Sequence, residues 1–559
     1  MILRSGNAID AGVAATFVAA VTEISHFGLG GEVPIIIHSA DQGDVVVISG
    51  QGTAPAAARP EVFEAAGGIP ANGPSAGAVP AVVDALCIAL AEYGTLSLRE
   101  VLTPAIQLAD GFPWYEALTG YMLSQVEAIR DYPSGAKVYR QGPDGTVPQV
   151  GSLFRQPQLA RTLRLLVEEE ARNTHKGRAV AIYAARDRFY SGDIGRQIAA
   201  AVSEAGGLMA AEDLAAYSGR VEPPTSRTLV TPRGEFQIFK TDFWGQGPVL
   251  LQALAILEGY DLADLEHNSA QYIHIVTEAL KLALADRDRH YGDPDVVDVP
   301  RIGLLSKEYA FRRRQLITDA ASLIQQPGDP WPFETEATGQ ENSQRDFARP
   351  PLRSRQVDVE ASDPDTTSIN TADAQGNLFS AAPSSAWFFG GTFIAGDTGV
   401  PLGNRLQAFV LGPEEHPNRI HPHKRPRTTL SPTVVLRNGK PFLALSSPGG
   451  DTQDQQALQV LLNILVFGMT PQQAVEAPRF NTLHHERSFG NHAIREGVLQ
   501  IENRIAPEVI EELRRGGRIV EVIGPFMMNT GTSLVGIDPA FGTLFGAADL
   551  RRQRFVTGW

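Results

Sequence analysis

The sequence predicts an α+β protein in which helices lie against a sandwich of strands. Three observations lead to this class. Residues 1–320 alternate between segments with helical spacing and short apolar strands. Residues 322–365 interrupt this pattern, and the strands that follow residue 366 pair as short hairpins. Hairpin strands with helices between them are typical of an α+β sandwich.

Helices dominate the expected structure of the first 320 residues. A small-residue helix starts at Asn7 or Asp10 and runs to Val21. The apolar runs 33–38 and 45–49 flank an Asp-Gln-Gly turn and are expected to be strands. Apolar spacing predicts further helices over 80–93, 98–110, 115–130, 160–170, 195–205, 211–216 and 271–289. The stretch 61–75, rich in Gly, Pro and Ala, is expected to be a loop.

A long irregular segment follows these helices. Residues 322–365 are rich in Pro, Gln and charged residues and lack apolar periodicity, so they cannot bury enough surface to order themselves. A segment of this length is usually functional or a linker. Beyond it the sequence predicts hairpins over 367–382, 433–445 and 534–546, and helices over 453–467 and 507–515.

Composition places the chain among ordinary globular proteins. It is 43% hydrophobic and 20% charged, which excludes a disordered chain, a collagen-like repeat and a disulfide scaffold. The 48 basic and 63 acidic residues give a net charge of −15, which argues against nucleic acid or an anionic membrane as the main partner. The single cysteine, Cys87, excludes an internal disulfide, and its apolar neighbours predict a buried core residue.

The sequence contains no predicted membrane span or export signal. No stretch approaches the roughly 20 apolar residues that a membrane-spanning helix needs. Asp10 interrupts any apolar core of a signal peptide near the N-terminus. We therefore expect a cytoplasmic protein, or a periplasmic one if the sequence starts inside a longer chain.

The junction between Asp365 and Thr366 is the most specific candidate for chemistry. It lies where the irregular segment meets an expected strand that includes a second threonine, Thr367. A threonine hydroxyl is a poor nucleophile unless a base removes its proton. Cleavage before Thr366 would create an α-amine close to its own hydroxyl, and an amine with a pKa of about 8 can act as that base. The same residues also fit a plain strand start with no catalytic role.

A glycine turn provides a second candidate group. The sequence Ser447-Pro448-Gly449-Gly450 follows an expected strand and precedes an expected helix. Backbone N–H groups at such a turn can stabilise an oxyanion. The motif alone is also a common simple turn.

Short motifs spread over nearly the whole chain identify a family. In chain order they are GNAIDAGVA (6–14), GLGG (28–31), EYGT (92–95), GGLMAAEDLAAY (206–217), ADRDRHYGDPD (285–295), DTT (365–367), SPT (431–433), SSPGG (446–450) and APRF (477–480). With these motifs the chain resembles the γ-glutamyltransferase family of N-terminal-nucleophile (Ntn) hydrolases. Its departures from the family pattern make it resemble a divergent, acylase-like or amidohydrolase-like member.

The resemblance implies a four-layer αββα sandwich that is made as one proenzyme and cleaves itself before Thr366. The large subunit would be 1–365, with 322–365 as a flexible linker that ends at Asp365, and the small catalytic subunit would be 366–559. Thr366 would be the nucleophile, and its new α-amine would be the base.

Five further residues take implied roles from the same resemblance. Ser384 occupies the position of a family threonine that hydrogen-bonds the nucleophile, and it keeps the hydroxyl. Gly449 and Gly450 match the oxyanion-hole glycines. Thr428 and Thr429 replace a Ser-Ser pair of the family and keep hydroxyl groups near the substrate.

The substrate-binding positions depart from the family pattern. Gln51 stands where typical members hold the substrate α-carboxylate with an arginine. Arg405 and Ala408 replace the Gln or Glu and the Asp that hold the α-amino group, and Ala386 replaces a further asparagine. A zwitterionic γ-glutamyl head would therefore lose both of its partners, the cation for its carboxylate and the anion for its ammonium group. It would meet a guanidinium where the ammonium group should bind. Such mismatched polar groups discriminate strongly between substrates.

These departures predict an amidohydrolase that cleaves an amide of a carboxylate-bearing acyl group through an acyl-enzyme. Arg405 would bind the carboxylate in bidentate fashion, and glutaryl-type or oxamate-type amides fit this requirement. An ion pair between Arg405 and a neighbouring acid is the structural alternative. Two other functions stay open: true γ-glutamyl transfer with glutathione hydrolysis, and an uncut protein that binds a ligand without turnover.

The remaining candidates concern a loop rich in histidine and basic residues. The three histidines within 416–423 match no standard zinc spacing, so we expect neither a metal nor a cofactor. The three cations within 424–427 are expected to be solvated or to attract an anionic substrate. The expected partners are a small-molecule amide and the two subunits of one precursor. Association of such heterodimers into a homo-oligomer stays open.

Overall fold

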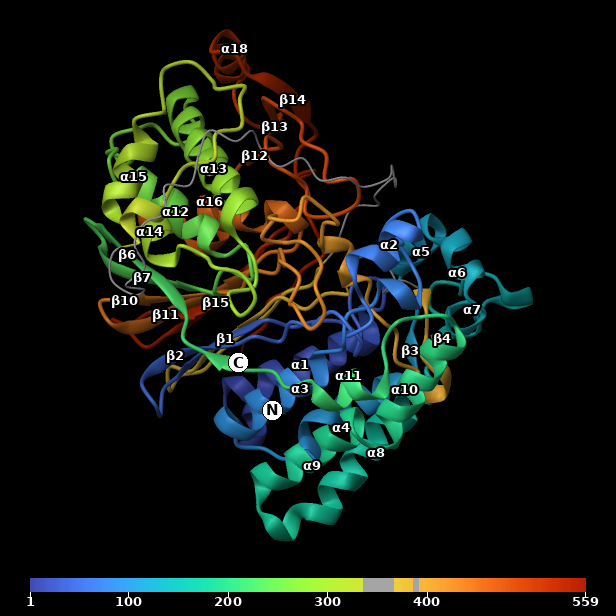
Figure 1. Cartoon of the computed structure of the whole chain (residues 1–559). Helices are drawn as coiled ribbons and strands as arrows, with labels where there is room; N and C mark the ends of the chain where they lie inside the picture. Colours follow the sequence, from blue (N-terminus) through green and yellow to red (C-terminus); the bar gives the residue numbers. More distant parts are fainter. Residues whose placement is uncertain (335–365, 386–391, 559) are drawn as a thin grey trace.

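The computed structural model describes residues 1–334, 366–385 and 392–558. Two antiparallel sheets lie face to face between two layers of helices (Figure 1). This arrangement confirms the expected α+β class and the four-layer order of helix, sheet, sheet and helix. Asp365, Ala386 and most of the irregular segment 322–365 lie outside the described residues.

The first sheet has five antiparallel strands in the order β5-β2-β1-β9-β8. They are β1 (Ile35–Ser39), β2 (Asp44–Ile48), β5 (Val221–Glu222), β8 (Ile369–Ala372) and β9 (Leu378–Ala381). The expected strands 33–38 and 45–49 and the expected hairpin 367–382 are confirmed. The central strand β1 pairs with β9, where Ile37 lies opposite Phe379. Residues from before and after the irregular segment therefore share one sheet.

The second sheet has six antiparallel strands in the order β16-β15-β11-β10-β7-β6. They are β6 (Thr225–Thr231), β7 (Gly234–Lys240), β10 (Thr433–Arg437), β11 (Lys440–Ser446), β15 (Ser533–Ile537) and β16 (Leu544–Ala548). The two expected hairpins of this region are confirmed. The sequence does not predict β6 and β7, because charged residues such as Arg227 and Glu235 interrupt the apolar alternation. The hydrogen bonds between β7 and β10 stabilise this strand, although its local sequence pattern does not predict it.

Apolar side chains fill the space between the two sheets. Ile36 and Leu378 of the first sheet join Val434 and Ala444 of the second in one buried cluster. Towards one end of this interface the contacts become polar, and Asn370 of β8 donates a hydrogen bond to Ser446 Oγ of β11 (3.0 Å). The candidate site lies at this polar end.

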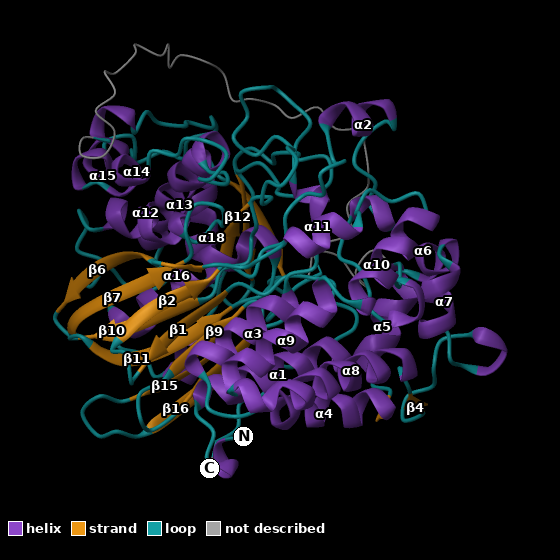
Figure 2. Cartoon of the chain, turned by 60° about the horizontal axis from the view of Figure 1, so that its bottom comes forward, coloured by secondary structure: helices purple, strands orange, loops and turns teal. Residues whose placement is uncertain are grey.

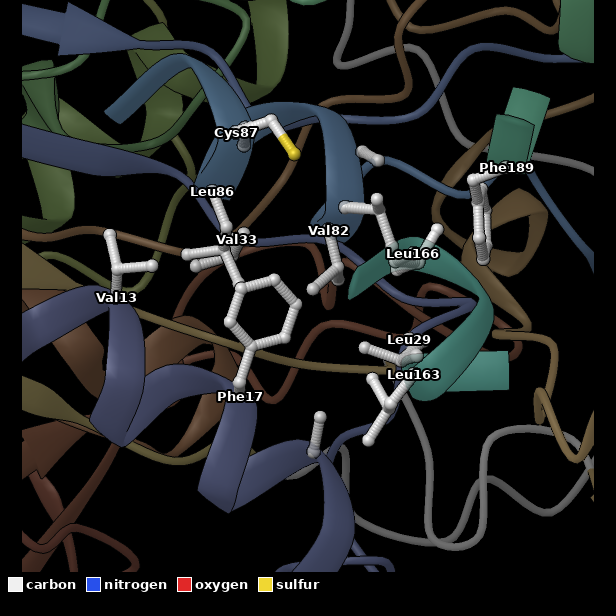
Figure 3. Packing of buried hydrophobic residues seen from close by; sticks show 14 of the residues in the cluster. Val13, Phe17, Leu29, Val33, Val82, Leu86, Cys87, Leu163, Leu166 and Phe189 are labelled. Atoms are coloured by element: carbon white, nitrogen blue, oxygen red, sulfur yellow. The ribbon is translucent and has the colours of Figure 1, made fainter. Parts of the chain in front are cut away.

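One helix layer covers the outer face of the first sheet (Figure 2). Its helices are α1 (Ala8–Thr22), α3 (Val82–Tyr93), α4 (Leu98–Asp110), α8 (Pro157–Asn173), α9 (Arg178–Tyr190), α10 (Asp193–Glu204) and α11 (Ala211–Ala216). The side chain of Asn7 accepts a hydrogen bond from Asp10 N and begins α1 where the sequence predicts it. Phe17 and Leu163 pack in the core of this layer, and Cys87 is fully buried there as expected (Figure 3).

The other helix layer covers the second sheet. Its helices are α12 (Pro248–Leu257), α13 (Ala270–His290), α14 (Arg301–Leu305), α15 (Lys307–Arg314), α16 (Gln453–Leu465), α17 (Pro471–Glu476) and α18 (Pro507–Arg515). The expected helices 271–289, 453–467 and 507–515 are confirmed to within a few residues. The sequence does not predict α12, because every residue of this helix is buried and its single polar residue, Gln252, forms no polar face that would reveal the helical period.

Smaller elements surround the sandwich. They are α2 (Pro60–Ala65), α5 (Glu116–Ser124), α6 (Val126–Asp131), α7 (Pro133–Tyr139), β3 (Phe112–Pro113), β4 (Leu153–Phe154), β12 (Phe480–Thr482), β13 (Val498–Glu502) and β14 (Ile519–Ile523), with short 3₁₀ helices that include η8 (Arg405–Ala408) and η9 (Gly450–Thr452). Two local expectations are wrong. The supposed loop 61–75 contains most of α2, which Pro60 starts, and the supposed helix 115–130 is divided at Gln125. Among the described residues, no helix combines the length and the apolar character needed to cross a bilayer.

Candidate active site

Thr366 lies just before β8, at the polar end of the interface between the sheets. Thr366 is 2% exposed, and the N–H of Thr367 donates to the carbonyl oxygen of Pro383 (3.0 Å). Gln453, the first residue of α16, donates from Nε2 to Thr366 Oγ1 (3.3 Å). The hydroxyl that the sequence identifies as the candidate nucleophile is therefore buried and contacted by a helix from the opposite layer.

Ser384 lies one residue after the Pro383 carbonyl that holds Thr367. Its backbone pairs with Glu32: Glu32 N donates to Ser384 O (2.9 Å), and Ser384 N donates to Glu32 O (3.0 Å). A Cβ at Gly31 would lie 2.3 Å from Ser384 O, so only glycine allows these two segments to approach so closely. The structure thus brings Ser384 and the glycine turn at 28–31 to the start of β8.

Gly449 and Gly450 form the turn between β11 and α16. Their φ angles are 122° and 60°, in the region that favours glycine. A Cβ on Gly449 would lie 2.3 Å from the carbonyl oxygen of Asn529, so no larger residue fits without movement. Among the described residues, no group accepts a hydrogen bond from either glycine N–H. Two unused donors at the start of a helix are suited to stabilising a negatively charged oxygen.

A buried polar network supports Gln453. Gln453 Oε1 accepts a hydrogen bond from Ser431 N (3.2 Å), and Ser431 Oγ donates to Asp454 Oδ1 (2.7 Å). Asp454 pairs with Lys240 Nζ (2.9 Å), and both side chains are at most 1% exposed. Burial raises the pKa of Asp454 and lowers the pKa of Lys240, while their mutual attraction opposes both shifts. The sequence interpretation missed these residues, although the polar run QDQQ (453–456) at the start of an apolar helix is a usable signal.

Arg405 is buried in η8 and pairs with Glu32. Its Nε and Nη2 both lie 3.1 Å from Glu32 Oε2, and the two side chains are 1% and 2% exposed. The ring of Phe489 is centred 5.4 Å from the guanidinium carbon. Within the described part of the chain, neither Nη1 nor Nη2 of Arg405 has a hydrogen-bond partner, although Nη2 lies within ion-pair distance of Glu32. The ion-pair alternative is therefore realised, and the guanidinium still has donors for a further acceptor.

Glu32 supplies a negative charge that the sequence interpretation missed. Burial raises the pKa of its carboxyl group, and the charge of Arg405 opposes this rise. The expectation that the pocket has gained a guanidinium and has no anion is therefore wrong. Glu32 lies outside the motifs that indicate the substrate-binding positions, and its only sequence signal is an acidic residue inside an otherwise apolar, glycine-rich run (GLGGEVPIII, 28–37).

Gln51 lies close to the Glu32 segment. Val33 N donates to the carbonyl oxygen of Gly50 (2.8 Å), which joins the chain around Gln51 to the chain around Glu32. Gln51 is 1% exposed, and its Oε1 has no hydrogen-bond partner among the described residues. An unsatisfied buried amide oxygen is uncommon in proteins, so it is a reasonable position for a ligand donor.

Thr428 and Thr429 are also buried, at 0% and 2% exposure. Thr428 Oγ1 accepts a hydrogen bond from Leu430 N (3.2 Å), and Thr428 O accepts one from Gln246 N (2.9 Å). Gln246 Nε2 also donates to Gly450 O (3.2 Å). Thr428 is therefore linked through Gln246 to the glycine turn, while contact of either threonine with a substrate stays a prediction.

The three cations within 424–427 are at most 6% exposed, so the expectation of solvated side chains is wrong. Arg425 pairs with Asp293 (2.8 Å) and Glu222 (2.6 Å). These carboxylates come from segments far away in the sequence, and only the fold brings them to Arg425. Among residues 1–334, 366–385 and 392–558, no group of three or more His, Cys, Asp or Glu side chains is arranged to hold a metal ion.

The fold and the site together define a class of protein. A buried threonine at a strand start, two stacked sheets between helix layers and a glycine turn at a helix start are the features of an Ntn hydrolase. The gamma-glutamyltranspeptidase family model matches residues 1–559, and the chain belongs to this family. It is accordingly an enzyme that acts on amide bonds.

Individual relatives fit this assignment. The chain is 32% identical over 558 residues to the glutathione hydrolase-like YwrD proenzyme of Bacillus subtilis, which covers 99% of this chain and 94% of the relative. It is 31% identical over 564 residues to the acylase ACY 1 proenzyme of a Pseudomonas species, covering 98% and 88% of the two chains. It is also similar to the crystal structure of cephalosporin acylase from Bacillus halodurans, with a TM-score of 0.83 and 27% identity over 100% of this chain and 92% of that chain.

Proposed function

We propose that this chain is a self-cleaving amidohydrolase in which Thr366 is the nucleophile. The observation that carries the proposal is the joint position of Thr366, Gln453 and the glycine turn. Gln453 Nε2 contacts Thr366 Oγ1 (3.3 Å), and Gly450, three residues earlier, belongs to the turn whose N–H groups have no acceptor among the described residues. A nucleophile that contacts the same helix start as the oxyanion site has the positioning that acyl transfer requires.

Self-cleavage between Asp365 and Thr366 would give subunits of residues 1–365 and 366–559. The proenzyme names of two relatives support this step. Both sheets contain strands from each side of the cut, so the two subunits would remain one folded body. Cleavage would also create the α-amine that a threonine nucleophile needs as a base.

The proposed reaction has two stages, formation of the acyl-enzyme and its hydrolysis. The α-amine of Thr366 takes the hydroxyl proton while Oγ1 forms a bond to the amide carbon, and the C=O electron pair moves to the oxygen near Gly449 and Gly450. Collapse of this intermediate restores the carbonyl and breaks the C–N bond, and the ammonium passes its proton to the leaving amine. Water then loses a proton to the same α-amine while its oxygen bonds to the acyl carbon. The second intermediate collapses, the bond from the acyl carbon to Oγ1 breaks, and the ammonium returns its proton to Oγ1, which releases the acid and the free hydroxyl.

For the acyl group we infer a carboxylate that binds Arg405. The guanidinium is buried, Glu32 accepts a hydrogen bond from Nε and lies 3.1 Å from Nη2, and neither Nη1 nor Nη2 has a hydrogen-bond partner among the described residues. An arginine can bridge two carboxylates in this way because its planar fork presents donors on two edges. Glutaryl-type, succinyl-type and oxamate-type amides carry the group that this edge requires.

A γ-glutamyl amide is the second candidate, and Glu32 is the observation that favours it. A zwitterionic head needs a cation for its carboxylate and an anion for its ammonium group. The buried Glu32–Arg405 pair offers both charges within 3.1 Å of one another. The two candidates therefore differ in what they require of Glu32.

Kinetics on a panel of amides distinguishes these candidates. Wild type, Arg405→Gln and Glu32→Gln would be assayed with γ-glutamyl, glutaryl, succinyl and oxamate amides. Arg405→Gln should lower kcat/KM about 100-fold on the amides that carry a carboxylate, compared with an uncharged acyl control. Glu32→Gln should spare the glutaryl and succinyl amides if the first candidate is right, and should lower γ-glutamyl hydrolysis if the second is right. Equal losses on every amide, the uncharged control included, would contradict carboxylate recognition.

Mass spectrometry and turnover of Thr366 variants test the reaction itself. Wild type should appear as two chains, whereas Thr366→Ala should stay a single chain of 60.2 kDa with kcat lowered roughly 10⁴-fold or more. Thr366→Ser is the matched control, because it keeps the hydroxyl and should keep cleavage. A wild-type chain that stays uncut, or a Thr366→Ala variant as active as wild type, would contradict the proposal and favour the uncut binding protein.

A further inference from the structure

Residues 550–558 form an arm that contacts the nucleophile from outside the sandwich. Most of the arm faces solvent: Leu550 is 63% exposed and Phe555 is 89% exposed. Arg554 instead points inward, and only 12% of its side chain is exposed. Its Nη1 donates to Thr367 Oγ1 (2.7 Å), and its Nη2 donates to Thr366 O (3.4 Å).

The same arm contacts Asn529, a residue beside the glycine turn. Arg552 Nη2 donates to Asn529 Oδ1 (2.5 Å), and Asn529 O accepts a hydrogen bond from Thr452 Oγ1 (2.9 Å). The Thr452 hydroxyl also lies 2.9 Å from the carbonyl oxygen of Gly449. One short segment therefore contacts Thr366 directly and is linked through Asn529 and Thr452 to the turn that would hold the oxyanion.

We propose that Arg554 is a positioning residue that holds the Thr366–Thr367 segment and keeps the α-amine of Thr366 unprotonated. This inference rests on the proposed function, because it concerns the base that Thr366 uses after cleavage. The guanidinium contacts the carbonyl oxygen of the same residue that carries the amine. A cation so close disfavours a second positive charge, so the amine pKa should fall below its ordinary value of about 8. At neutral pH more of the enzyme then holds the amine in the form that accepts a proton.

Among the described residues, Arg554 is the cation that contacts the Thr366–Thr367 segment directly. Other titratable groups on the elements around it include Arg552 of the same arm, which donates to Asn529, Glu23, Tyr115, Tyr121, the buried pair Glu32–Arg405 and the buried pair Lys240–Asp454. Each buried pair is neutral overall, and burial raises the pKa of the Tyr115 hydroxyl, so it carries no charge at neutral pH. Glu23, at the end of α1, lies 3.7 Å from Arg554 and opposes its charge in part, since 31% of its side chain is exposed to water.

The pH profile of kcat/KM tests this electrostatic role. Activity should rise as the α-amine loses its proton, so the acidic limb of the profile reports the amine pKa. Arg554→Gln removes the cation, the amine pKa rises, and the limb should move to higher pH by about one unit. Glu23→Gln removes the opposing anion, so the limb should move in the other direction. Arg554→Lys keeps a charge but loses the forked geometry, so the limb should stay near its wild-type position while kcat falls.

The controls separate this inference from the proposed function. Each profile is normalised to the fraction of chain that mass spectrometry finds cleaved before Thr366, so that a maturation defect is not counted as a loss of turnover. If Arg554→Gln fails to mature, the Glu23→Gln profile still decides the question, because its shift has the opposite sign and a merely structural role would not produce it. A Glu23→Gln limb that coincides with that of wild type would overturn the role of Arg554, and so would an unmoved limb in matured Arg554→Gln. Activity in Thr366→Ala would instead overturn the proposed function.

Discussion

The reacting end and the recognition end of the candidate site are built from different chemistry. At the reacting end, neutral groups face the hydroxyl and the oxyanion position: the Gln453 amide contacts Thr366 Oγ1, and the Gly449 and Gly450 N–H groups have no described acceptor. At the recognition end, Arg405 and Glu32 are buried charges 3.1 Å apart. Neutral dipoles serve any amide carbonyl, whereas a buried ion pair discriminates, because a charge that loses its partner is expensive. The comparison indicates that turnover and substrate choice can be altered separately.

With Thr366 intact, the largest loss of turnover is expected for Gly449→Ala. The new Cβ would lie 2.3 Å from Asn529 O on a backbone with φ of 122°, so the turn must move and its N–H groups must turn away. We expect kcat to fall about 10²–10³-fold on every amide, measured by steady-state kinetics on the panel. Gly439→Ala is the matched control, because Gly439 also has a positive φ of 73° but open space around it. A loss confined to carboxylate-bearing amides would contradict the separation of the two ends.

A smaller effect, on stability, is expected at the recognition end. Arg405→Gln leaves the Glu32 carboxylate buried without its partner, which should lower the free energy of unfolding by about 3 kcal/mol near pH 8. The double variant with Glu32→Gln should recover most of this loss, because no unpaired charge remains. Urea unfolding would be measured in the uncut Thr366→Ala background, so that one chain unfolds in every sample.

The loss of unfolding free energy in Arg405→Gln should depend on pH. Burial already raises the pKa of Glu32, and removal of Arg405 should raise it further. A carboxyl whose folded-state pKa is raised stabilises the fold at low pH, and this contribution is lost as pH rises through the folded-state pKa. The gap between Arg405→Gln and wild type should therefore narrow on acidification from pH 8 to pH 5. An equal gap at both pH values would show that Glu32 is not the charge left unpaired.

The smallest effect is expected for Gln453→Ala. The hydrogen bond from Gln453 Nε2 to Thr366 Oγ1 is long, at 3.3 Å, and joins two neutral groups. Its loss should lower kcat about tenfold, which corresponds to roughly 1.4 kcal/mol, on all amides alike. Gln472→Ala, on the exposed face of α17, is the control and should change nothing in turnover. A Gln453→Ala variant that discriminates between amides would show that Gln453 takes part in recognition as well as in reaction, and would contradict the separation of the two ends.

Local signals were sufficient to predict much of the fold. The Asn7 cap and the small-residue run predict α1, and the turn residues at 373–377 and 437–440 predict two of the hairpins. The sequence did not predict elements whose hydrophobic pattern is determined by the strands and helices packed around them. The strands β6 and β7 carry charges that only pairing and an exposed edge explain, and α12 is buried on every side.

The candidate site divides in the same way. Thr366 and the Gly449–Gly450 turn could be predicted because each lies in a short motif with its own chemistry. Glu32 and Arg554 could not be predicted, because no spacing relates Glu32 to Arg405, 373 positions later, or Arg554 to Thr366, 188 positions earlier. Only the stacked sheets and the returning arm bring these groups together.

The pairing of β1 with β9 has a consequence for the synthesis of the chain. Ile37 leaves the ribosome early but must wait for Phe379 to complete the centre of the first sheet. A chain that grows at about 5–20 residues per second exposes this strand for tens of seconds before its partner exists. During that time the apolar strand β1 has an unpaired edge, which is a template for aggregation. We therefore expect the nascent chain to depend on chaperones more than a protein of similar size whose strands pair with near neighbours. We also expect a lower growth temperature to improve the yield of folded protein.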